Sequence, residues 1–173
     1  MHYKNYLSKF HKSGKSMHFS IRKGFSFGLT SGIITTLGLI VGLHSSTHSK
    51  LVILGGVLVI AVADAFSDAL GIHMSEESET KHTTREIWMS TLATFLSKFI
   101  FALTFVVPIL LFSLSTAIII SVVWGLSLIV LLSLYISKQQ KVRSYRAVIE
   151  HLVIAILVII ITHYVGDFVA LLG

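Results

Sequence analysis

Apolar residues are gathered in long runs along the chain, without the strict alternation that marks β-strands. Runs of about 20 residues match a helix that crosses the roughly 30 Å hydrocarbon core of a bilayer, whereas a membrane β-barrel requires alternating segments. Pro108 lies inside the third run and predicts a kink there. The pattern predicts an all-α integral membrane protein with five transmembrane helices, at about 24–43, 51–74, 88–112, 114–136 and 147–171.

The composition agrees with the pattern of apolar runs. Of the 173 residues, 54% are hydrophobic and 13% are charged, whereas soluble domains carry about 25% charged residues. This excludes a soluble enzyme. The chain has no cysteine, so any metal ligand must be an oxygen, an imidazole or a thioether. The net charge of +6 comes from basic residues that flank the apolar runs, which indicates membrane topology rather than binding to nucleic acid.

Basic residues are distributed unevenly between the two ends of the predicted spans. Twelve Lys and Arg residues precede the first span or lie in the 75–87 and 137–146 connections, whereas Lys50 stands alone on the other side. Under the positive-inside rule the basic segments face the cytoplasm, and they share one side only when the number of spans is odd. We therefore expect 1–23 to be a basic cytoplasmic tail and 24–173 the membrane domain, with the carboxyl terminus outside the cell or in a lumen.

Glycines recur at four-residue spacing in the first span. Gly28 and Gly32 follow Gly24 at this spacing, and Gly38 and Gly42 repeat it further along. Glycines on one helix face let a second helix approach closely, although glycine is also simply frequent in membrane helices. Five spans do not divide into two equal repeats, so symmetry around a pathway requires a second copy of the chain. We expect a homodimer with the first span, through Gly28, Gly32, Gly38 and Gly42, at its axis.

The second span is the polar exception among the five. Its polar and small residues fall at offsets of 0, 3, 4, 7 and 11, which places them on one stripe of a helix: Asp64, Ser67, Asp68, Gly71 and Ser75. An ionised Asp at mid-bilayer costs roughly 2.5–3.5 kcal/mol on insertion scales, so two of them in one span require a partner or a function. The stripe predicts a cation pathway.

The depth of each charged residue follows from the helical rise. Counted from the cytoplasmic end near Met74, Asp68 lies about 9 Å deep and Asp64 about 15 Å deep. Lys98 lies in the third span, which runs in the opposite direction, and it also reaches about 15 Å. Asp64 and Lys98 are therefore candidates for a buried salt bridge between the two spans. Asp68 has no cation at its own depth, so we expect it to be the better candidate for a metal or proton site.

Acidic residues and an imidazole cluster after the second span, at the cytoplasmic mouth. Such groups attract divalent cations and offer oxygen and nitrogen ligands. They equally suit a solvated loop, or an acidic start to the next helix that its dipole favours. At the opposite end, His163 and Asp167 suit either an exit site or a hydrated helix end. The residues of the cytoplasmic cluster are Glu76, Glu77, Glu79, His82 and Glu86.

Several segments resemble those of the vacuolar iron transporter family. Phe27 to Gly42 is similar to the first span of the family, and Ala63 to Ser75 is similar to its second. The same pattern has Pro108 in the third span and a basic linker, here Lys138 to Arg146, before a last span that ends in His163 to Gly166. The resemblance extends from about residue 22 onward.

The resemblance implies a five-span homodimer that moves ferrous iron, and often manganese, out of the cytoplasm, in eukaryotic members by proton antiport into a vacuole. The family usually has Asp in the first span where this chain has Ser31, and Met in the second where it has Asp68. Ser31 lies about 10 Å deep, level with Asp68. The family's Glu-rich cytoplasmic domain is reduced here to the 75–87 connection. Oxygen ligands without the thioether favour harder ions such as manganese or magnesium.

We therefore expect a divalent cation transporter for Fe²⁺ or Mn²⁺ in the cell membrane of a prokaryote, with proton antiport as a further expectation and no permanently bound cofactor. Its partners are the lipid bilayer, metal ions, protons and a second copy of the chain, but not nucleic acid. The alternative is a non-transporting scaffold or regulatory subunit with structural Asp–Lys pairs. An enzyme is not expected, because neither HExxH nor GxSxG occurs. The expected cation ligands are Asp68, Asp64, Ser31, Met74, His73, Glu76, Glu77 and Glu79.

Overall fold

The chain is helical throughout nearly all of the part that the structure describes. This structure is a computed structural model, which describes residues 2–79, 81–140 and 144–172, with side chains within 16–79, 81–138 and 145–172. The helices in chain order are α1 (His2–Thr47), α2 (Lys50–Ser78), α3 (Thr84–Thr104), α4 (Val106–Leu111), α5 (Leu114–Gln140) and α6 (Ser144–Ala170). No strand occurs in these described ranges. The prediction of an all-α protein is confirmed.

Five helical segments within the described chain are long and apolar enough to cross a membrane. They are Ser16–Thr47, Lys50–Ser78, Thr84–Leu111, Leu114–Lys138 and Tyr145–Ala170. Each contains its predicted span to within one residue at either end. The protein is therefore a multi-pass membrane protein, and its outward apolar faces contact the lipid bilayer.

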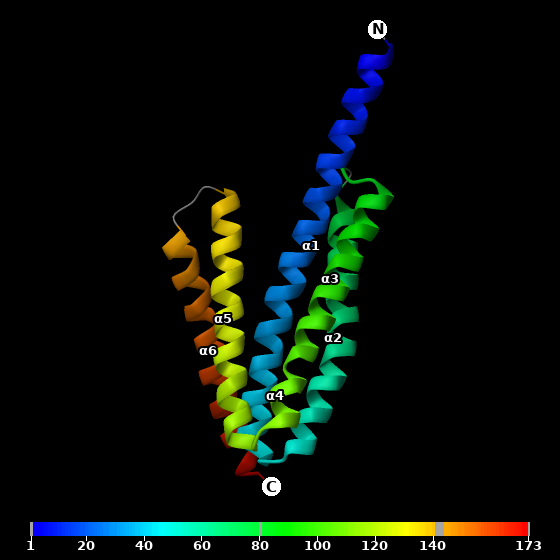
Figure 1. Ribbon diagram of the computed structural model, residues 1–173. Helices are drawn as coiled ribbons and strands as arrows, with labels where there is room; N and C mark the ends of the chain where they lie inside the picture. The colour runs from blue at the N-terminus through cyan, green and yellow to red at the C-terminus, as the bar shows by residue number, and fades with distance from the viewer. Residues whose placement is uncertain (1, 80, 141–143, 173) are drawn as a thin grey trace.

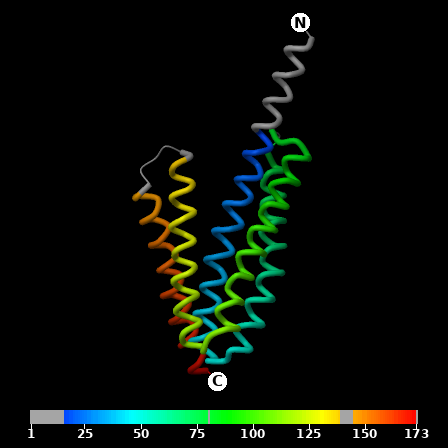
Figure 2. The backbone as a smooth tube through the Cα atoms, in the orientation of Figure 1, coloured from blue at the N-terminus to red at the C-terminus, as the bar shows by residue number. Residues whose placement is uncertain are grey.

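α1 is the central helix of the bundle. It contacts α2, α3, α5 and α6, with α2 and α3 on one side and α5 and α6 on the other (Figure 1). The two ends of the chain lie at opposite ends of the bundle, as an odd number of crossings requires (Figure 1). Toward the N-terminal end, α5 and α6 diverge from α1 (Figure 2). A cavity of about 350 Å³ at this end is lined by His18, Ile21, Arg22, Phe25 and Tyr135.

α1 begins well before the predicted first span. The sequence predicts a tail over 1–23, whereas the helix runs without interruption from His2 into the first span. The segment has no proline, and Gly14 is its one glycine, so it holds no strong helix breaker. Once the span is helical, each added residue gains a backbone hydrogen bond without a new nucleation cost. The predicted tail and the first span are one helix.

The predicted kink at Pro108 is confirmed. α3 ends at Thr104, and α4 follows after Phe105. Proline lacks the N–H that would bond the carbonyl four residues earlier, which belongs to Thr104. The Phe105 N–H instead bonds the Ala102 carbonyl oxygen at 3.2 Å, a tighter turn. The Trp124 ring nitrogen of α5 donates to the Thr104 hydroxyl at 3.0 Å and holds the break against α5.

Lys50 binds the carbonyl oxygens at the C-terminal end of α4. It is the first residue of α2, and its Nζ donates to the carbonyl oxygens of Leu110, at 3.3 Å, and Phe112, at 3.0 Å. The last carbonyls of a helix have no partner within that helix. A cation at this position also interacts favourably with the helix dipole. Lys50 therefore fastens the beginning of α2 to the connection between α4 and α5.

The glycines of α1 pack against other helices of the same chain. A Cβ atom added at Gly28 would lie 2.3 Å from the Thr94 carbonyl oxygen of α3, and one at Gly42 would lie 3.2 Å from the Thr162 carbonyl oxygen of α6. Gly32 and Gly38 likewise face α3 and α6. The close helix approach thus occurs within the chain, and a second copy of α1 finds no room on these faces in this packing. The dimer contact assigned to the four glycines stays a prediction without support from the fold.

Candidate functional site

Lys98 lies at the centre of the polar contacts inside the bundle. It belongs to α3, is 1% exposed and is among the largest fully buried side chains. Its Nζ lies 2.5 Å from Asp64 Oδ2 and 2.5 Å from Asp68 Oδ2, both on α2. It also donates to the Ser31 hydroxyl of α1 at 2.9 Å. Three spans therefore meet at one ammonium group.

Small residues allow the three helices to meet so closely. Gly32 faces Lys98, and a Cβ at that glycine would lie 3.1 Å from the Lys98 carbonyl oxygen. On α2, Ala61, Ala65 and Ala69 are buried beside the aspartates, so the helix backbone approaches its neighbours and short Asp side chains reach the lysine. The sequence spacing that makes the α2 stripe therefore also places both carboxylates at the α1–α3 contact.

The expectation that Asp68 has no cation at its depth is wrong. Asp64 and Asp68 are one helical turn apart, about 6 Å along the axis, and the long Lys98 side chain ends between them. Lys98 donates a hydrogen bond to Asp68, whereas the nearby Asp64 Oδ2 has no hydrogen-bond partner in the described chain. The ammonium thus lies between the two carboxylates, with Nζ 2.5 Å from one oxygen of each.

The carboxylates are more open than the ammonium that they hold. The side chains of Asp64 and Asp68 are 26% and 19% exposed, whereas that of Lys98 is 2% exposed. The three charged groups sum to −1, and a membrane interior weakens such charge less than water does. The cluster therefore carries a formal net charge of −1, and its carboxylates are the part that is more open.

The other predicted ligands on α2 lie away from this cluster. The His73 ring bonds the Thr91 hydroxyl at 2.9 Å and packs against the Trp88 ring, with 4.8 Å between centroids. Met74 and Glu77 are exposed. Within the residues that the structure describes, no group of three or more His, Asp or Glu side chains is placed to hold a metal ion. Of the predicted ligands, the two aspartates and Ser31 are the ones that meet at Lys98.

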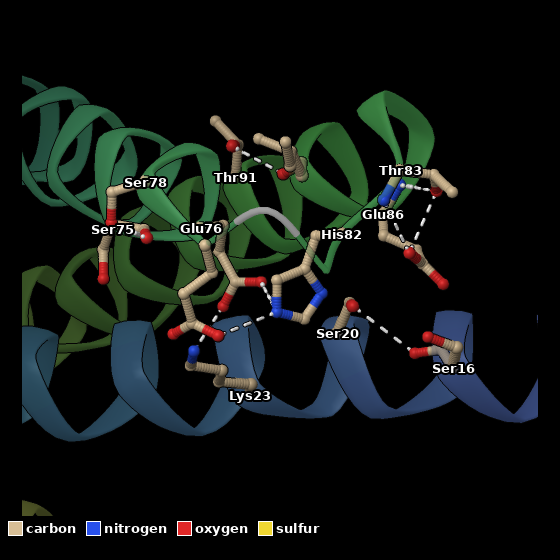
Figure 3. A network of polar contacts seen from close by, with 12 residues as sticks. Ser16, Ser20, Lys23, Ser75, Glu76, Ser78, His82, Thr83, Glu86 and Thr91 are labelled. Atoms are coloured by element: carbon tan, nitrogen blue, oxygen red, sulfur yellow. Dashed lines mark hydrogen bonds and ion pairs between the residues drawn. The ribbon is translucent and has the colours of Figure 1, made fainter.

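Glu76 belongs to a second cluster, at the N-terminal end of the bundle. It is 0% exposed, and its carboxylate forms an ion pair with Lys23 of α1. His82 Nε2 lies 3.4 Å from Glu76 Oε2 and 3.2 Å from Glu79 Oε2 (Figure 3). A solvated loop, one of the two alternatives for this segment, is therefore wrong for Glu76. The cluster joins α1 to the end of α2 and to the α2–α3 connection.

Glu86 caps the start of α3, as one interpretation of the acidic cluster expects. Its carboxylate accepts from the Thr83 N–H at 2.9 Å, and the Thr83 hydroxyl accepts from the Glu86 N–H at 3.4 Å. This reciprocal pair is a capping box, which satisfies two N–H groups that a helix start leaves without partners. Glu86 therefore acts in the structure as a helix cap.

The C-terminal end of the bundle has a contact that the sequence did not indicate. The Ser45 hydroxyl of α1 is hydrogen-bonded to His163 Nδ1 of α6, and His163 Nε2 lies 3.5 Å from Asp167 Oδ2. The side chains of His163 and Asp167 are about half exposed, at 51% and 50%. The four-residue spacing predicted the His163–Asp167 pair, but Ser45 carries no pattern that marks its partner.

Comparison with known proteins gives a match to a family model. The family model described as the VIT family matches residues 23–88, a segment that contains the α1 part with Ser31, all of α2 and the start of α3. Lys98 lies beyond it. No curated protein matches the chain, and no solved structure matches it. In general, this family suggests a membrane metal-ion transporter. The resemblance predicted from the sequence is confirmed over residues 23–88, which match the VIT family model.

Proposed function

We propose that the protein moves a divalent metal cation across a membrane, with the carboxylates of Asp64 and Asp68 as its principal ligands. The observation that carries the proposal is the convergence of two partly exposed carboxylates from a membrane-spanning helix. Carboxylates are costly inside a bilayer, and they mark ion pathways there more often than they serve other roles. Their position inside the VIT-family segment supports the same function.

The ligand chemistry supports a preference among divalent cations. Two carboxylates and the Ser31 hydroxyl supply oxygen only. Oxygen ligands suit Mn²⁺, Mg²⁺ and Fe²⁺ better than soft ions such as Cu⁺. The exposed Met74, the thioether nearest in sequence, is more than a helical turn beyond Asp68. We propose Fe²⁺ or Mn²⁺ as the cargo, movement out of the cytoplasm, and exchange for protons.

A non-transporting scaffold is the second candidate. Lys98 already has both aspartates as partners, so the cluster also satisfies the requirement that a buried charge be paired. In that case the three side chains serve only to hold α2 and α3 together. Transport measurements separate the two functions, because a scaffold carries no ion.

Asp68→Asn is expected to lower cation transport at least tenfold while the protein still folds. Asn keeps the shape of the side chain and accepts a hydrogen bond from Lys98, but it removes the charge that offsets the dehydration of a divalent ion. Asp64 still pairs with Lys98, so the ammonium keeps one counter-ion. The measurement is uptake of labelled Mn²⁺ and Fe²⁺ into proteoliposomes that contain a pH-sensitive dye.

Ser127→Ala is the control for this experiment, since Ser127 is exposed and uncharged and lies on α5, which contributes no residue to the cluster around Lys98. Its flux is expected to equal that of the unmodified protein. Full flux in Asp68→Asn shows that Asp68 is not a ligand of the transported cation. An unmodified protein that carries no divalent metal favours the scaffold.

The proposed orientation places the Glu76 end of the bundle in the cytoplasm. Ser78, at this end, and Thr47 and Ser115, at the other, are exposed, and the chain has no native cysteine to interfere. We expect Ser78→Cys to react with an impermeant thiol reagent only from the cytoplasmic side. Thr47→Cys and Ser115→Cys are expected to react only from outside, and labelling of all three from one side contradicts the five-span topology.

We also propose a homodimer, now with α2 rather than α1 at its interface. Ala63, Ser67 and Gly71 are exposed and lie four residues apart, and a Cβ at Gly71 would meet nothing within 4 Å. Small residues at this spacing suit close packing of membrane helices. A second copy on this face also shields Asp64 and Asp68 from lipid.

This interface predicts a specific cross-link. Ser67→Cys is expected to give a covalent dimer on mild oxidation, because symmetry brings the same α2 face of two copies together. Leu157→Cys on α6, also exposed, is the control and is expected to stay monomeric on denaturing gels. The opposite result, cross-linking through α6 alone, places the interface elsewhere.

A further inference from the structure

We propose that Lys98 is a tethered competitor for the transported cation: its ammonium occupies the carboxylates that a divalent ion must take, and it sets how tightly that ion binds. This inference rests on the proposed transport function and adds a specificity-determining residue to the same site. It assigns a role to a side chain that lies outside the segment matched to the family.

The geometry is that of an occupied cation site. The Nζ of Lys98 has three oxygen neighbours, from Asp64, Asp68 and Ser31, at 2.5, 2.5 and 2.9 Å. These oxygens come from two helices and surround one positive charge. They are also the oxygens that the transport proposal assigns to the metal ion. A divalent ion and the ammonium therefore cannot both make these contacts.

The net charge of the cluster determines how strongly it attracts a divalent cation. With Lys98 in place the cluster carries −1, whereas the two carboxylates alone carry −2. A divalent cation is attracted more strongly by the two carboxylates alone than by the cluster with Lys98 in place, and the difference is large in a medium of low dielectric constant. Each ion that binds must displace the ammonium, and the returning ammonium helps to expel it. A transporter benefits from this arrangement, because a cation that binds too tightly does not leave the site.

The difference in exposure between the carboxylates and Lys98 indicates which group an arriving ion meets first. The carboxylates are partly open, whereas Lys98 lies behind them, next to the backbone of α1 at Gly32. An arriving ion therefore meets the carboxylates first. The proposed exchange requires the lysine side chain to withdraw from the carboxylates. Binding beside an unmoved ammonium is the competing arrangement, and it predicts that the nature of residue 98 has little influence on affinity.

Two substitutions with opposite expected effects test the proposal in the full-length chain. Lys98→Met removes the competitor and is expected to bind Mn²⁺ at least about tenfold more tightly than the unmodified protein. Lys98→Arg keeps the charge and offers a planar fork that holds two carboxylates more firmly. It is expected to bind Mn²⁺ at least about tenfold more weakly. Mn²⁺ binding in detergent, followed by the loss of the free-ion electron paramagnetic resonance signal, measures both.

Lys81→Met is the matched control, because Lys81 is exposed in the α2–α3 connection and its replacement changes the net charge by the same amount. Its Mn²⁺ affinity is expected to stay within about twofold of the unmodified protein. If Lys98→Met does not fold, Lys98→Arg decides alone, since it retains the buried ion pairs. Unchanged or tighter Mn²⁺ binding in Lys98→Arg overturns the proposal.

The outcome is distinguishable from failure of the proposed function. If the unmodified protein neither binds nor transports any divalent cation, the transport function fails and this inference fails with it. If the unmodified protein transports Mn²⁺ but both Lys98 variants bind it with unchanged affinity, transport stands and the competitor role is wrong. Tighter binding with slower turnover in Lys98→Met supports both.

Discussion

Replacing Asp64 and Asp68 together by Asn is expected to destabilise the protein by about 3–5 kcal/mol. The double change leaves the ammonium of Lys98, 1% exposed, without a counter-ion among the groups that now surround it. A single change leaves one carboxylate in place and should cost much less. The measurements are the yield of monodisperse protein in detergent and the unfolding transition in a denaturing detergent.

Adding Lys98→Met to the double variant is expected to restore most of the lost stability, because the orphaned charge is then absent. Glu77→Gln with Asp167→Asn is the control of equal charge change, at an exposed residue and at one whose side chain is 50% exposed. This control is expected to unfold like the unmodified protein. A double Asn variant of unaltered stability shows that the ion pairs contribute nothing to the fold.

The second large effect is expected at Gly28. A Cβ at this position would lie 2.3 Å from the Thr94 carbonyl oxygen and 2.3 Å from Ser97 Oγ, and the carbonyl is backbone that cannot rotate away. Gly28→Ala therefore forces α1 away from α3, at a cost of about 1–3 kcal/mol, and Gly28→Leu costs more. The shift also moves Ser31 away from Lys98, so cation transport falls with stability. Thermal unfolding and transport measure the two effects.

Gly55→Ala on α2 is the matched control, because a Cβ there would meet nothing within 4 Å. It is expected to be neutral or slightly stabilising, since alanine favours a helix more than glycine does. Equal destabilisation by Gly28→Ala and Gly55→Ala shows that the α1–α3 contact does not decide the effect.

The spans were predictable because the bilayer imposes a length and a composition on any helix that crosses it. Pro108 also acts locally, through its missing N–H, so its effect was visible in the sequence. The helices that pack against the glycines of α1 were not predictable from the sequence. Four-residue spacing shows that a face is closely packed, but it does not say which helix fills it, and here α3 and α6 fill both faces within one chain.

The site was predicted in part. Counting the helical rise places Asp64 level with Lys98, but it treats each residue as a point at its own depth. A lysine side chain spans more than one helical turn, so Lys98 reaches Asp68 as well. Glu76 was misjudged for a related reason. Its partner Lys23 lies on a part of α1 that the sequence pattern assigned to a tail, and a helix that continues past the span brings Lys23, 37% exposed, to the buried Glu76.

The contacts of Lys50 bear on the uneven distribution of basic residues between the two ends of the spans. It is the single exception to the positive-inside distribution of the twelve other Lys and Arg residues that flank the spans. Its ammonium is held by the carbonyl oxygens of Leu110 and Phe112, where the partial negative charge of a helix end offsets it. In the proposed orientation, Lys50 crosses the bilayer before the α4 residues, which follow it in the chain, are in place to accept its hydrogen bonds. Translocation of the hairpin between α1 and α2 therefore becomes harder to reverse once α4 has folded, because returning Lys50 would first require breaking its two bonds.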